Sequence, residues 1–336
     1  MRVLINGFGR IGRTVLRAWA LSHRSRGAAQ WPALEIIGVN DIAAPETRAH
    51  LFEFDSVFGP YPGKVALQDG RLLLDDRSVR LTREADIAAL DLSDIDLVME
   101  CTGRADSKPH AAAGLSAGAR RVLISGPSAA AEVTMVLGAN DQALRAHHKV
   151  ISNASCTTNA LAPLVALVDR HWGLEGGWMT TIHCYTGSQP SVDAPRDDLA
   201  RARAAALSMA PTTTSAGKLL DVVLPGLAGR IACAAVRVPT ASVSAIDLCV
   251  TTRSQPDAAM INTVLREAST ERGSVIGCTD KPLVSTDLRA RPESVIMALP
   301  ETHVAPGGML RLFGWYDNEW GYSCRMLDMA ARLASI

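Results

Sequence analysis

Val3-Leu4-Ile5-Asn6-Gly7-Phe8-Gly9-Arg10-Ile11-Gly12 is the stretch that decides the fold of this 336-residue chain. Its apolar start indicates a strand, and the apolar positions Val15, Leu16 and Trp19 beyond it indicate a helix. The glycines of a G-x-G-x-x-G pattern between a strand and a helix permit a tight turn and let a pyrophosphate approach the helix N-terminus. The stretch therefore predicts a dinucleotide site, with Gly7, Gly9 and Gly12 in its loop.

A second apolar strand, at residues 34–41, supports this interpretation because it ends in Asp41. A carboxylate at this place hydrogen-bonds the adenosine ribose and repels a 2′-phosphate, so we expect NAD rather than NADP. The spacing from Gly12 to Asp41 exceeds the usual value of about 20 residues. We interpret the polar residues 22–32 as a surface insertion that accounts for the extra length.

Further apolar runs at 97–103 and 121–127 alternate with helical patterns. Such alternation predicts a Rossmann-type, doubly wound parallel sheet that binds ligands at the carboxyl ends of its strands. Thr102 and Ser125 follow two of these strands. Each is a candidate cofactor contact or an ordinary turn residue.

The periodicity changes in the second half of the chain. Strand-like runs at 178–185, 231–239 and 243–252 lack a long helix between every pair, which favours an α+β domain with a mainly antiparallel sheet. The charged run 193–203 is typical of a solvated helix face or a subunit contact. We expect a dinucleotide-binding domain at 1–155, a catalytic domain at 156–318 and an amphipathic helix at 319–336 that packs back on the first domain.

The composition limits the possible partners. Lys plus Arg and Asp plus Glu both number 34, so there is no basic excess to indicate a nucleic acid or membrane partner. The seven cysteines show no C-x-x-C spacing, so we expect reduced thiols and no metal site. A strand at the start of the chain leaves no room for a signal peptide, and no apolar run could span a bilayer. We therefore expect a cytoplasmic protein.

Ile151-Ser152-Asn153-Ala154-Ser155-Cys156-Thr157-Thr158-Asn159 indicates a strand and a turn, and an apolar helical pattern follows it. Cys156 would then begin a helix, where free N–H groups and the helix dipole favour a thiolate. The alternative is a small buried hydrophobic residue. The polar neighbours favour a nucleophile.

His183 lies on an apolar strand and is followed by Tyr185-Thr186-Gly187. A single histidine is more often structural than catalytic. Together with Cys156 on a separate element, however, His183 predicts a thiol nucleophile activated by a base.

These stretches resemble the phosphorylating glyceraldehyde-3-phosphate dehydrogenase family, and they occur in the family's order. The matching blocks are Ile5-Asn6-Gly7-Phe8-Gly9-Arg10-Ile11-Gly12, Val39-Asn40-Asp41, Ser152-Asn153-Ala154-Ser155-Cys156-Thr157-Thr158-Asn159, His183-Cys184-Tyr185-Thr186-Gly187, Arg237-Val238-Pro239-Thr240 and Trp315-Tyr316-Asp317-Asn318-Glu319-Trp320-Gly321-Tyr322.

The resemblance implies NAD-dependent oxidation of D-glyceraldehyde 3-phosphate to 1,3-bisphosphoglycerate, a glycolytic reaction that uses inorganic phosphate. Cys156 would form a thiohemiacetal and then a thioester, with His183 as the base. The resemblance also implies a homotetramer with residues 185–206 at an interface.

Roles for the other site residues follow from the same resemblance. It implies that Thr186 and Arg237 bind the substrate's phosphate, and that Ser155, Thr157, Arg201, Thr214 and Ser215 bind inorganic phosphate. The implied NAD contacts are Gly9, Arg10, Ile11, Asp41, Arg83, Ser125 and Asn318. Ser215 and Ser188 depart from the family's usual residues.

Three alternatives remain open. Erythrose-4-phosphate dehydrogenase, a relative that hydrolyses its thioester, shares the Cys and His, although Tyr185-Thr186-Gly187 favours the triose enzyme. A further relative uses arsenate as the acyl acceptor. A non-catalytic binding protein on this scaffold would be expected to have lost Cys156 or His183, and both are present.

Overall fold

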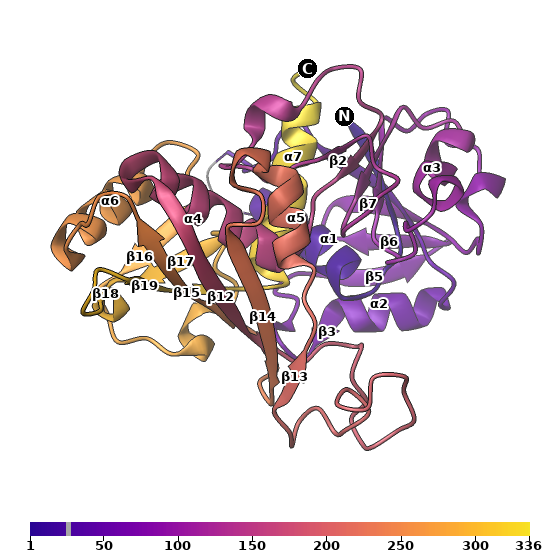
Figure 1. Ribbon diagram of the computed structural model, residues 1–336. Helices are drawn as coiled ribbons and strands as arrows, with labels where there is room; N and C mark the ends of the chain where they lie inside the picture. The colour runs from indigo at the N-terminus through magenta and orange to yellow at the C-terminus, as the bar shows by residue number, and fades with distance from the viewer. Residues whose placement is uncertain (25–27) are drawn as a thin grey trace. The chain divides into compact units, whose positions relative to one another are not determined.

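The computed structural model describes residues 1–24 and 28–336, and contacts within the chain divide it into two units (Figure 1). Unit 1 comprises Met1–Met135, Asp141–Ala154 and Ser323–Ile336. Unit 2 comprises Val136–Asn140 and Ser155–Tyr322.

A nine-stranded sheet forms the centre of unit 1, in the order β10-β11-β9-β8-β1-β2-β7-β6-β5. The strands from β10 to β7 are parallel, whereas β6 and β5 turn back as antiparallel neighbours. Leu4, Val98 and Val122 lie in the apolar core beside this sheet. The bounds are β1 (Arg2–Asn6), β2 (Glu35–Asn40), β5 (Val65–Gln68), β6 (Arg71–Leu74), β7 (Arg77–Thr82), β8 (Leu97–Glu100), β9 (Arg121–Ile124), β10 (Val133–Thr134) and β11 (Val150–Ser152), with a separate pair β3 (Phe54–Asp55) and β4 (Gly59–Pro60).

The helices of unit 1 are α1 (Arg10–Arg24), α2 (Pro45–Glu53), α3 (Lys108–Ser116) and most of α7 (Trp320–Leu333). Ion pairing and hydrogen bonding hold α7 on this unit. Arg332 pairs with Asp141 at 2.7 Å, and Arg121 donates to the Leu333 carbonyl at 2.7 Å. The C-terminal helix thus packs on the same unit as the N-terminal strand.

Residues 22–32 are only partly a surface insertion. Helix α1 continues through Arg24, residues 25–27 lie outside the described residues, and Trp31 is buried. The Trp31 indole donates to Asp328 on α7 at 2.6 Å. The prediction of an exposed insertion is therefore wrong for the C-terminal end of residues 22–32, because Trp31 is buried there and bonds to α7.

Unit 2 contains an eight-stranded sheet in the order β13-β14-β12-β15-β19-β17-β16, with β18 beside β19, and Figure 1 shows these strands in succession. The pairs β12–β14 and β16–β17 are parallel, and the other pairs are antiparallel. The bounds are β12 (Leu174–Cys184), β13 (Ala210–Thr212), β14 (Ile231–Val238), β15 (Ser244–Thr252), β16 (Ile276–Thr279), β17 (Val295–Ala298), β18 (His303–Val304) and β19 (Leu310–Tyr316).

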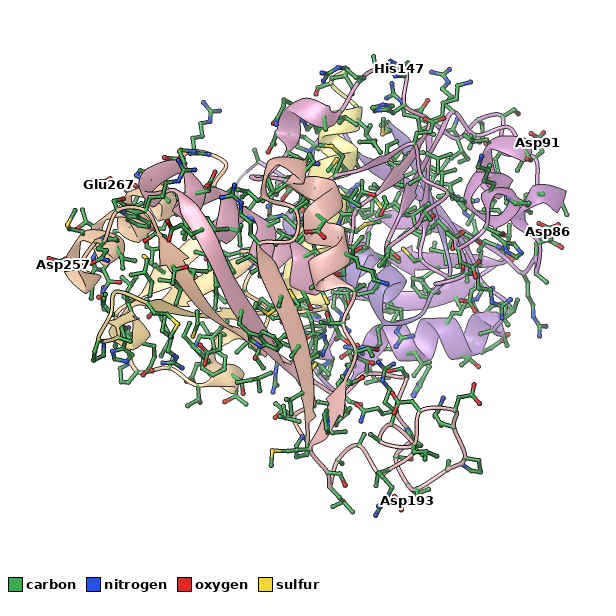
Figure 2. All side chains as sticks on the ribbon, viewed as in Figure 1. Asp86, Asp91, His147, Asp193, Asp257 and Glu267 are labelled. Carbon is green, nitrogen blue, oxygen red and sulfur yellow. The ribbon has the colours of Figure 1, made fainter. Side chains whose placement is uncertain are left out.

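Three helices complete unit 2, namely α4 (Cys156–Trp172), α5 (Ala216–Val223) and α6 (Ala258–Thr270). Helix α4 packs against β12, β15 and β17. Helix α6 begins at Asp257, whose carboxylate accepts the Met260 N–H at 2.8 Å. Figure 2 shows Asp257 and Glu267 along α6.

The charged run 193–203 is not a helix. It belongs to the irregular segment 185–209 between β12 and β13, on which Figure 2 shows Asp193. Asp193 pairs with Arg203 at 2.8 Å and accepts the Ala204 N–H at 2.8 Å. These local bonds hold a folded loop, so the helical alternative predicted from the charge pattern is wrong.

The predicted fold class is confirmed by the structure, which is α/β with a mainly parallel sheet in unit 1 and a mainly antiparallel sheet in unit 2. None of the helices among the described residues combines the length and the apolarity that a bilayer crossing requires.

Candidate active site

Cys156 is the first residue of α4, as the sequence predicts. The preceding Ser155 is the N-cap residue, and its hydroxyl accepts the Thr158 N–H at 3.0 Å. Ala154 has a φ of 53°, a left-handed conformation that is uncommon for a residue with a side chain. The turn thus delivers the thiol to the start of a capped helix.

The Cys156 sulfur lies 3.7 Å from Nε2 of His183, which is buried on β12. On the other side of the ring, His183 Nδ1 lies 2.7 Å from the Cys184 carbonyl oxygen. If Nδ1 carries its proton and donates it to this carbonyl, Nε2 is free to take a proton from the thiol. The two residues therefore have the geometry of a nucleophile and its base.

The electrostatics of the pair differ from the sequence-based expectation of a thiolate. Burial raises the pKa of the Cys156 thiol, and the hydrogen bonds from Thr157 and the charge of Arg237 oppose this rise only in part. Burial also lowers the pKa of His183 to about 4, and repulsion from Arg237 adds to this effect. Burial therefore disfavours the charged form of both groups.

Arg237 on β14 and Thr186 meet beside His183. Arg237 Nη1 lies 3.0 Å from His183 Nδ1, 2.9 Å from the Cys184 carbonyl oxygen and 3.3 Å from the Thr186 hydroxyl. The Thr186 hydroxyl also lies 3.0 Å from that of Ser188. A guanidinium and two hydroxyls are suitable donors for a phosphate.

The residues expected to bind inorganic phosphate fall into two groups. Arg201 pairs with Asp198 at 3.1 Å and donates to the hydroxyls of Thr212 and Thr213, immediately before Thr214 and Ser215. On α4, the Ser155 hydroxyl caps the helix, and the Thr157 hydroxyl lies 2.9 Å from that of Tyr316.

Tyr316 is a member of this site that sequence reasoning missed. It is buried on β19, and its hydroxyl lies 2.9 Å from that of Thr157 and 2.8 Å from that of Thr181. The ring stands edge-on to His183 with centroids 6.1 Å apart. Side chains of β19 alternate between buried and partly exposed positions, and Tyr316 occupies a buried one. This alternation along the strand was the signal that could have placed its side chain in the interior.

Asn318 lies in unit 2, where its Oδ1 is 3.1 Å from the Cys184 sulfur and 3.3 Å from the Ser244 hydroxyl. Ser244 in turn accepts the Cys184 N–H at 3.1 Å. These bonds fix the residue next to His183.

The glycine loop of unit 1 has the close backbone contacts that a dinucleotide site needs. Gly7 has a φ of 91°, and a Cβ there would lie 2.7 Å from the Thr102 nitrogen. A Cβ on Gly12 would lie 2.1 Å from the Gly7 carbonyl oxygen, whereas a Cβ on Gly9 would meet nothing within 4 Å. The open space at Gly9 suits a pyrophosphate.

Asp41 supports this loop directly. Its carboxylate accepts the Phe8 N–H at 2.6 Å and the Ala43 N–H at 2.8 Å. The carboxylate thus fixes the position of the loop as well as supplying a negative charge at the end of β2.

A cavity of ≈ 270 Å³ opens beside the loop, and Gly7, Gly9, Asp41 and Thr102 are among the residues that line it. Sequence reasoning gave no site role to several further polar residues that line the cavity: Asn6, Glu84, Asp86, Glu100, Arg104 and His110.

The other predicted cofactor residues of unit 1 do not line this cavity: Arg10, Ile11, Gly12, Arg83 and Ser125. Arg10 pairs with Asp55 at 2.5 Å, and Arg83 donates to the Ile42 carbonyl at 2.8 Å. The Ser125 N–H donates to the Glu100 carbonyl at 2.9 Å.

Two family models match the chain. The NAD binding domain of glyceraldehyde 3-phosphate dehydrogenase matches residues 1–108, and the C-terminal domain of the same family matches residues 155–318. The chain is also 43% identical to the glyceraldehyde-3-phosphate dehydrogenase of Xanthobacter flavus, over 100% of this chain and 99% of the relative. It is 43% identical to the glyceraldehyde-3-phosphate dehydrogenase of Cereibacter sphaeroides, over 100% of this chain and 99% of that relative. It is 44% identical to the enzyme of the same name from Pseudomonas aeruginosa, over 100% of this chain and 98% of that relative. The chain therefore belongs to the glyceraldehyde-3-phosphate dehydrogenase family and is an NAD-dependent dehydrogenase.

Proposed function

We propose that this enzyme oxidises D-glyceraldehyde 3-phosphate to 1,3-bisphosphoglycerate, with NAD and inorganic phosphate as co-substrates. The carrying observation is the arrangement around His183, where Cys156 lies at Nε2 and Arg237 lies at Nδ1. A nucleophile–base pair next to the half-buried guanidinium of Arg237 suits an aldehyde that carries a phosphate. The names of the three relatives support this substrate.

In the proposed reaction, the Cys156 sulfur attacks the aldehyde carbon while His183 Nε2 takes the thiol proton. His183 returns this proton to the new oxyanion, which gives a thiohemiacetal. The backbone N–H of Cys156, at the start of α4, is placed to stabilise the developing negative charge.

NAD, when bound, supplies the acceptor for the hydride that leaves this carbon. His183 removes the hydroxyl proton in the same step, and an acyl thioester remains on Cys156. We propose that Gly7, Gly9 and Asp41 hold the dinucleotide, since they line the cavity of unit 1. Arg10, Ile11, Gly12, Arg83, Thr102, Ser125 and Asn318 complete the proposed cofactor set.

Inorganic phosphate then attacks the thioester carbon, the carbon–sulfur bond breaks, and the Cys156 thiolate regains its proton from the His183 imidazolium. We propose that Ser155, Thr157, Arg201, Thr214 and Ser215 bind this phosphate. The Thr212 and Thr213 hydroxyls, at and just after the end of β13, accept hydrogen bonds from Arg201 and support the assignment.

Omitting phosphate tests the acceptor. Without phosphate, we expect one burst of NADH per active site and then no turnover, because the thioester persists. Continued turnover would instead indicate hydrolysis, as in erythrose-4-phosphate dehydrogenase, and a higher kcat/KM for erythrose 4-phosphate would support that alternative. Arsenate added in place of phosphate should restore turnover, and a higher kcat/KM for arsenate than for phosphate would indicate the arsenate-using relative. The Cys156→Ser variant controls for the burst and should show none.

We further propose that the enzyme is a homotetramer with residues 185–206 at an interface. Val192, Leu199 and Leu207 on the 185–209 segment are 71%, 81% and 83% exposed. Apolar side chains gathered on one exposed segment are typical of a surface that another subunit covers. Sedimentation analysis should give four times the monomer mass, and a monomer at micromolar concentration would contradict the proposal.

We propose that the dinucleotide-binding domain comprises residues 1–155, with the helix at 319–336 packed on it, and that the catalytic domain comprises residues 156–318. These two domains correspond closely to units 1 and 2, respectively. The proposed reaction needs the Cys156 thiol to stay reduced, and this requirement supports a cytoplasmic location and a role in glycolysis.

A further inference from the structure

Glu100, the last residue of β8, has a buried carboxylate that lines the cavity of unit 1. One carboxylate oxygen accepts the Asn6 side-chain N–H at 2.5 Å. The other oxygen accepts the Thr102 backbone N–H at 2.8 Å and also accepts the Thr102 hydroxyl. Burial of a carboxylate is costly unless hydrogen bonds replace its water. These three donors replace that water and hold Glu100 in the cavity wall.

A chain of side-chain hydrogen bonds continues from Glu100 across the sheet. The Asn6 Oδ1 atom accepts the Asn40 side-chain N–H at 2.8 Å, and the Asn40 Oδ1 atom accepts the Thr82 hydroxyl at 2.9 Å. The four residues are the last residues of β8, β1, β2 and β7, which are parallel neighbours in this order. The chain therefore crosses the carboxyl ends of four strands, where such a sheet binds its ligands.

The backbone of Glu84 fixes the direction of this chain. Its N–H donates to Asn40 Oδ1 at 2.9 Å, and its carbonyl accepts from Asn40 Nδ2 at 2.9 Å. Because a backbone N–H only donates and a carbonyl only accepts, the Asn40 amide has one possible orientation. Asn6 must then present Oδ1 to Asn40 and Nδ2 to Glu100. The group at position 100 must accept there and at the Thr102 N–H, which a carboxylate does and a glutamine amide cannot.

The chain joins the segments that line the cavity. Asn6 precedes Gly7, and the Gly7 N–H donates to the Asn40 carbonyl at 2.8 Å. Asn40 in turn precedes Asp41, and Gly7, Asp41 and Glu84 all line the cavity. A reversed amide at Asn6 or Asn40 would leave buried donors facing one another, and the backbone would have to move to separate them.

We propose that Glu100 is a positioning residue of the cofactor site, because its carboxylate sets the direction of the hydrogen-bond chain that holds the glycine loop and Glu84 around the cavity. This inference rests on the proposed function, since it takes the cavity as the NAD site. Glu100 acts through Asn6 and Thr102, and it needs no contact with the cofactor. The loop is thereby held in the conformation that receives the dinucleotide before NAD arrives, which lowers the cost of binding.

Glu100→Gln keeps the size of the side chain but turns one acceptor into a donor. The new amide N–H₂ must face either Asn6 Nδ2 or the Thr102 N–H, so a buried donor loses its acceptor. We expect the affinity for NAD, measured by calorimetric titration, to fall about tenfold. The KM for NAD should rise by the same factor. The kcat at saturating NAD should stay within about twofold of the wild type, because Cys156 and His183 lie outside the chain.

Glu132→Gln is the matched control, because the Glu132 carboxylate also accepts backbone N–H groups in unit 1 but does not line the cavity. It accepts the Lys149 N–H at 2.6 Å. This variant should bind NAD as the wild type does, even if urea unfolding without NAD shows a lower stability. A change in Kd confined to Glu100→Gln therefore separates positioning of the cofactor site from general stabilisation of unit 1.

An exchange of amide and carboxylate tests the direction of the chain itself. In the double variant Glu100→Gln with Asn40→Asp, the new amide at position 100 donates to Asn6 Oδ1, and Asn6 Nδ2 donates to the new carboxylate at position 40. That carboxylate still accepts the Glu84 N–H, so the chain is rebuilt in the opposite direction and the net charge is unchanged. Asn40→Asp alone points an oxygen at Asn6 Oδ1 and should weaken NAD binding. We expect the double variant to bind NAD more tightly than either single variant.

Three results overturn the proposal: a wild-type Kd for NAD in Glu100→Gln, an equal loss in Glu132→Gln, and a double variant that does not fold or binds NAD no more tightly than the single variants. Titrations without an aldehyde are independent of the substrate and the acyl acceptor, so a wrong substrate in the proposed function leaves them unaffected. A wild-type NAD affinity in Gly9→Ala would show that the proposed cofactor residues are wrong. A failed exchange together with weakened NAD binding in Gly9→Ala overturns the role of Glu100 alone.

Discussion

His183 Nδ1 and Arg237 Nη1 meet at one acceptor, the Cys184 carbonyl oxygen, at distances of 2.7 Å and 2.9 Å. The base of the proposed reaction and the proposed ligand of the substrate's phosphate are thereby fixed to the same backbone atom. Bonds from Cys184 to Ser244 and Asn318 hold that part of the chain in turn. A change at any of these partners should alter both proton transfer and substrate binding.

Removing the base should slow the chemical step strongly. We expect His183→Asn to lower kcat about 10² to 10⁴-fold, because positioned general bases contribute by this amount. Steady-state NADH formation measures the effect. His171→Asn is the control, since His171 is exposed at the end of α4 and should leave kcat unchanged. A decrease of less than tenfold in His183→Asn would contradict the role of His183 as base.

The buried His183 should make folding stability depend on pH. Burial lowers its pKa to about 4 in the folded protein from the ordinary value of 6.5, so the unfolded chain binds more protons between these values. Stability should be complete above pH 6.5 and should fall by about 3 kcal/mol as the pH drops through this window. Urea unfolding of the wild type and His183→Asn at pH 7 and pH 4.5 measures the difference. Equal losses in both proteins would show that another group is responsible.

The charge of Asp41 should determine the preference for NAD. Asp41→Asn keeps an oxygen that can accept the Phe8 N–H but removes the negative charge. We expect kcat/KM with NADP to rise about tenfold relative to NAD, because repulsion of the 2′-phosphate is lost. Asp91→Asn is the control, because Asp91 is exposed and does not line the cavity; Figure 2 labels this residue. This variant should leave the ratio unchanged. An unchanged ratio in Asp41→Asn would refute this role.

Gly9 and Gly12 should respond differently to the same substitution. Gly12→Ala would place a Cβ 2.1 Å from the Gly7 carbonyl oxygen, so we expect a loss of about 3 kcal/mol in stability. In Gly9→Ala the added Cβ has no protein atom within 4 Å, so the free energy of unfolding should be unchanged. The affinity for NAD should fall, because the Cβ occupies the space proposed for the pyrophosphate. Unfolding curves and NAD titrations measure the two effects. Wild-type NAD affinity in Gly9→Ala would place the pyrophosphate elsewhere.

Local features of the sequence were sufficient to predict most of the framework. The strand–glycine–helix pattern predicted β1 and α1, and the polar block around Cys156 predicted a helix start at this residue. These predictions succeeded because turns, caps and helix starts depend on residues within a few positions of one another. The helical alternative for the charged run 193–203 was wrong because its pattern matches a helix face, whereas Asp193 bonds across the loop to Arg203 and Ala204.

By itself, the sequence determined which residues we propose for the chemistry, namely a cysteine at a helix start, a histidine on a strand and an arginine farther along. The tertiary structure decided how they act on one another. His183 lies 27 positions from Cys156 and 54 from Arg237, and Tyr316 lies 135 from Thr181. Burial and charge at these contacts shift the pKa values of Cys156 and His183, because desolvation and Coulomb repulsion depend on distance in space rather than on separation along the chain.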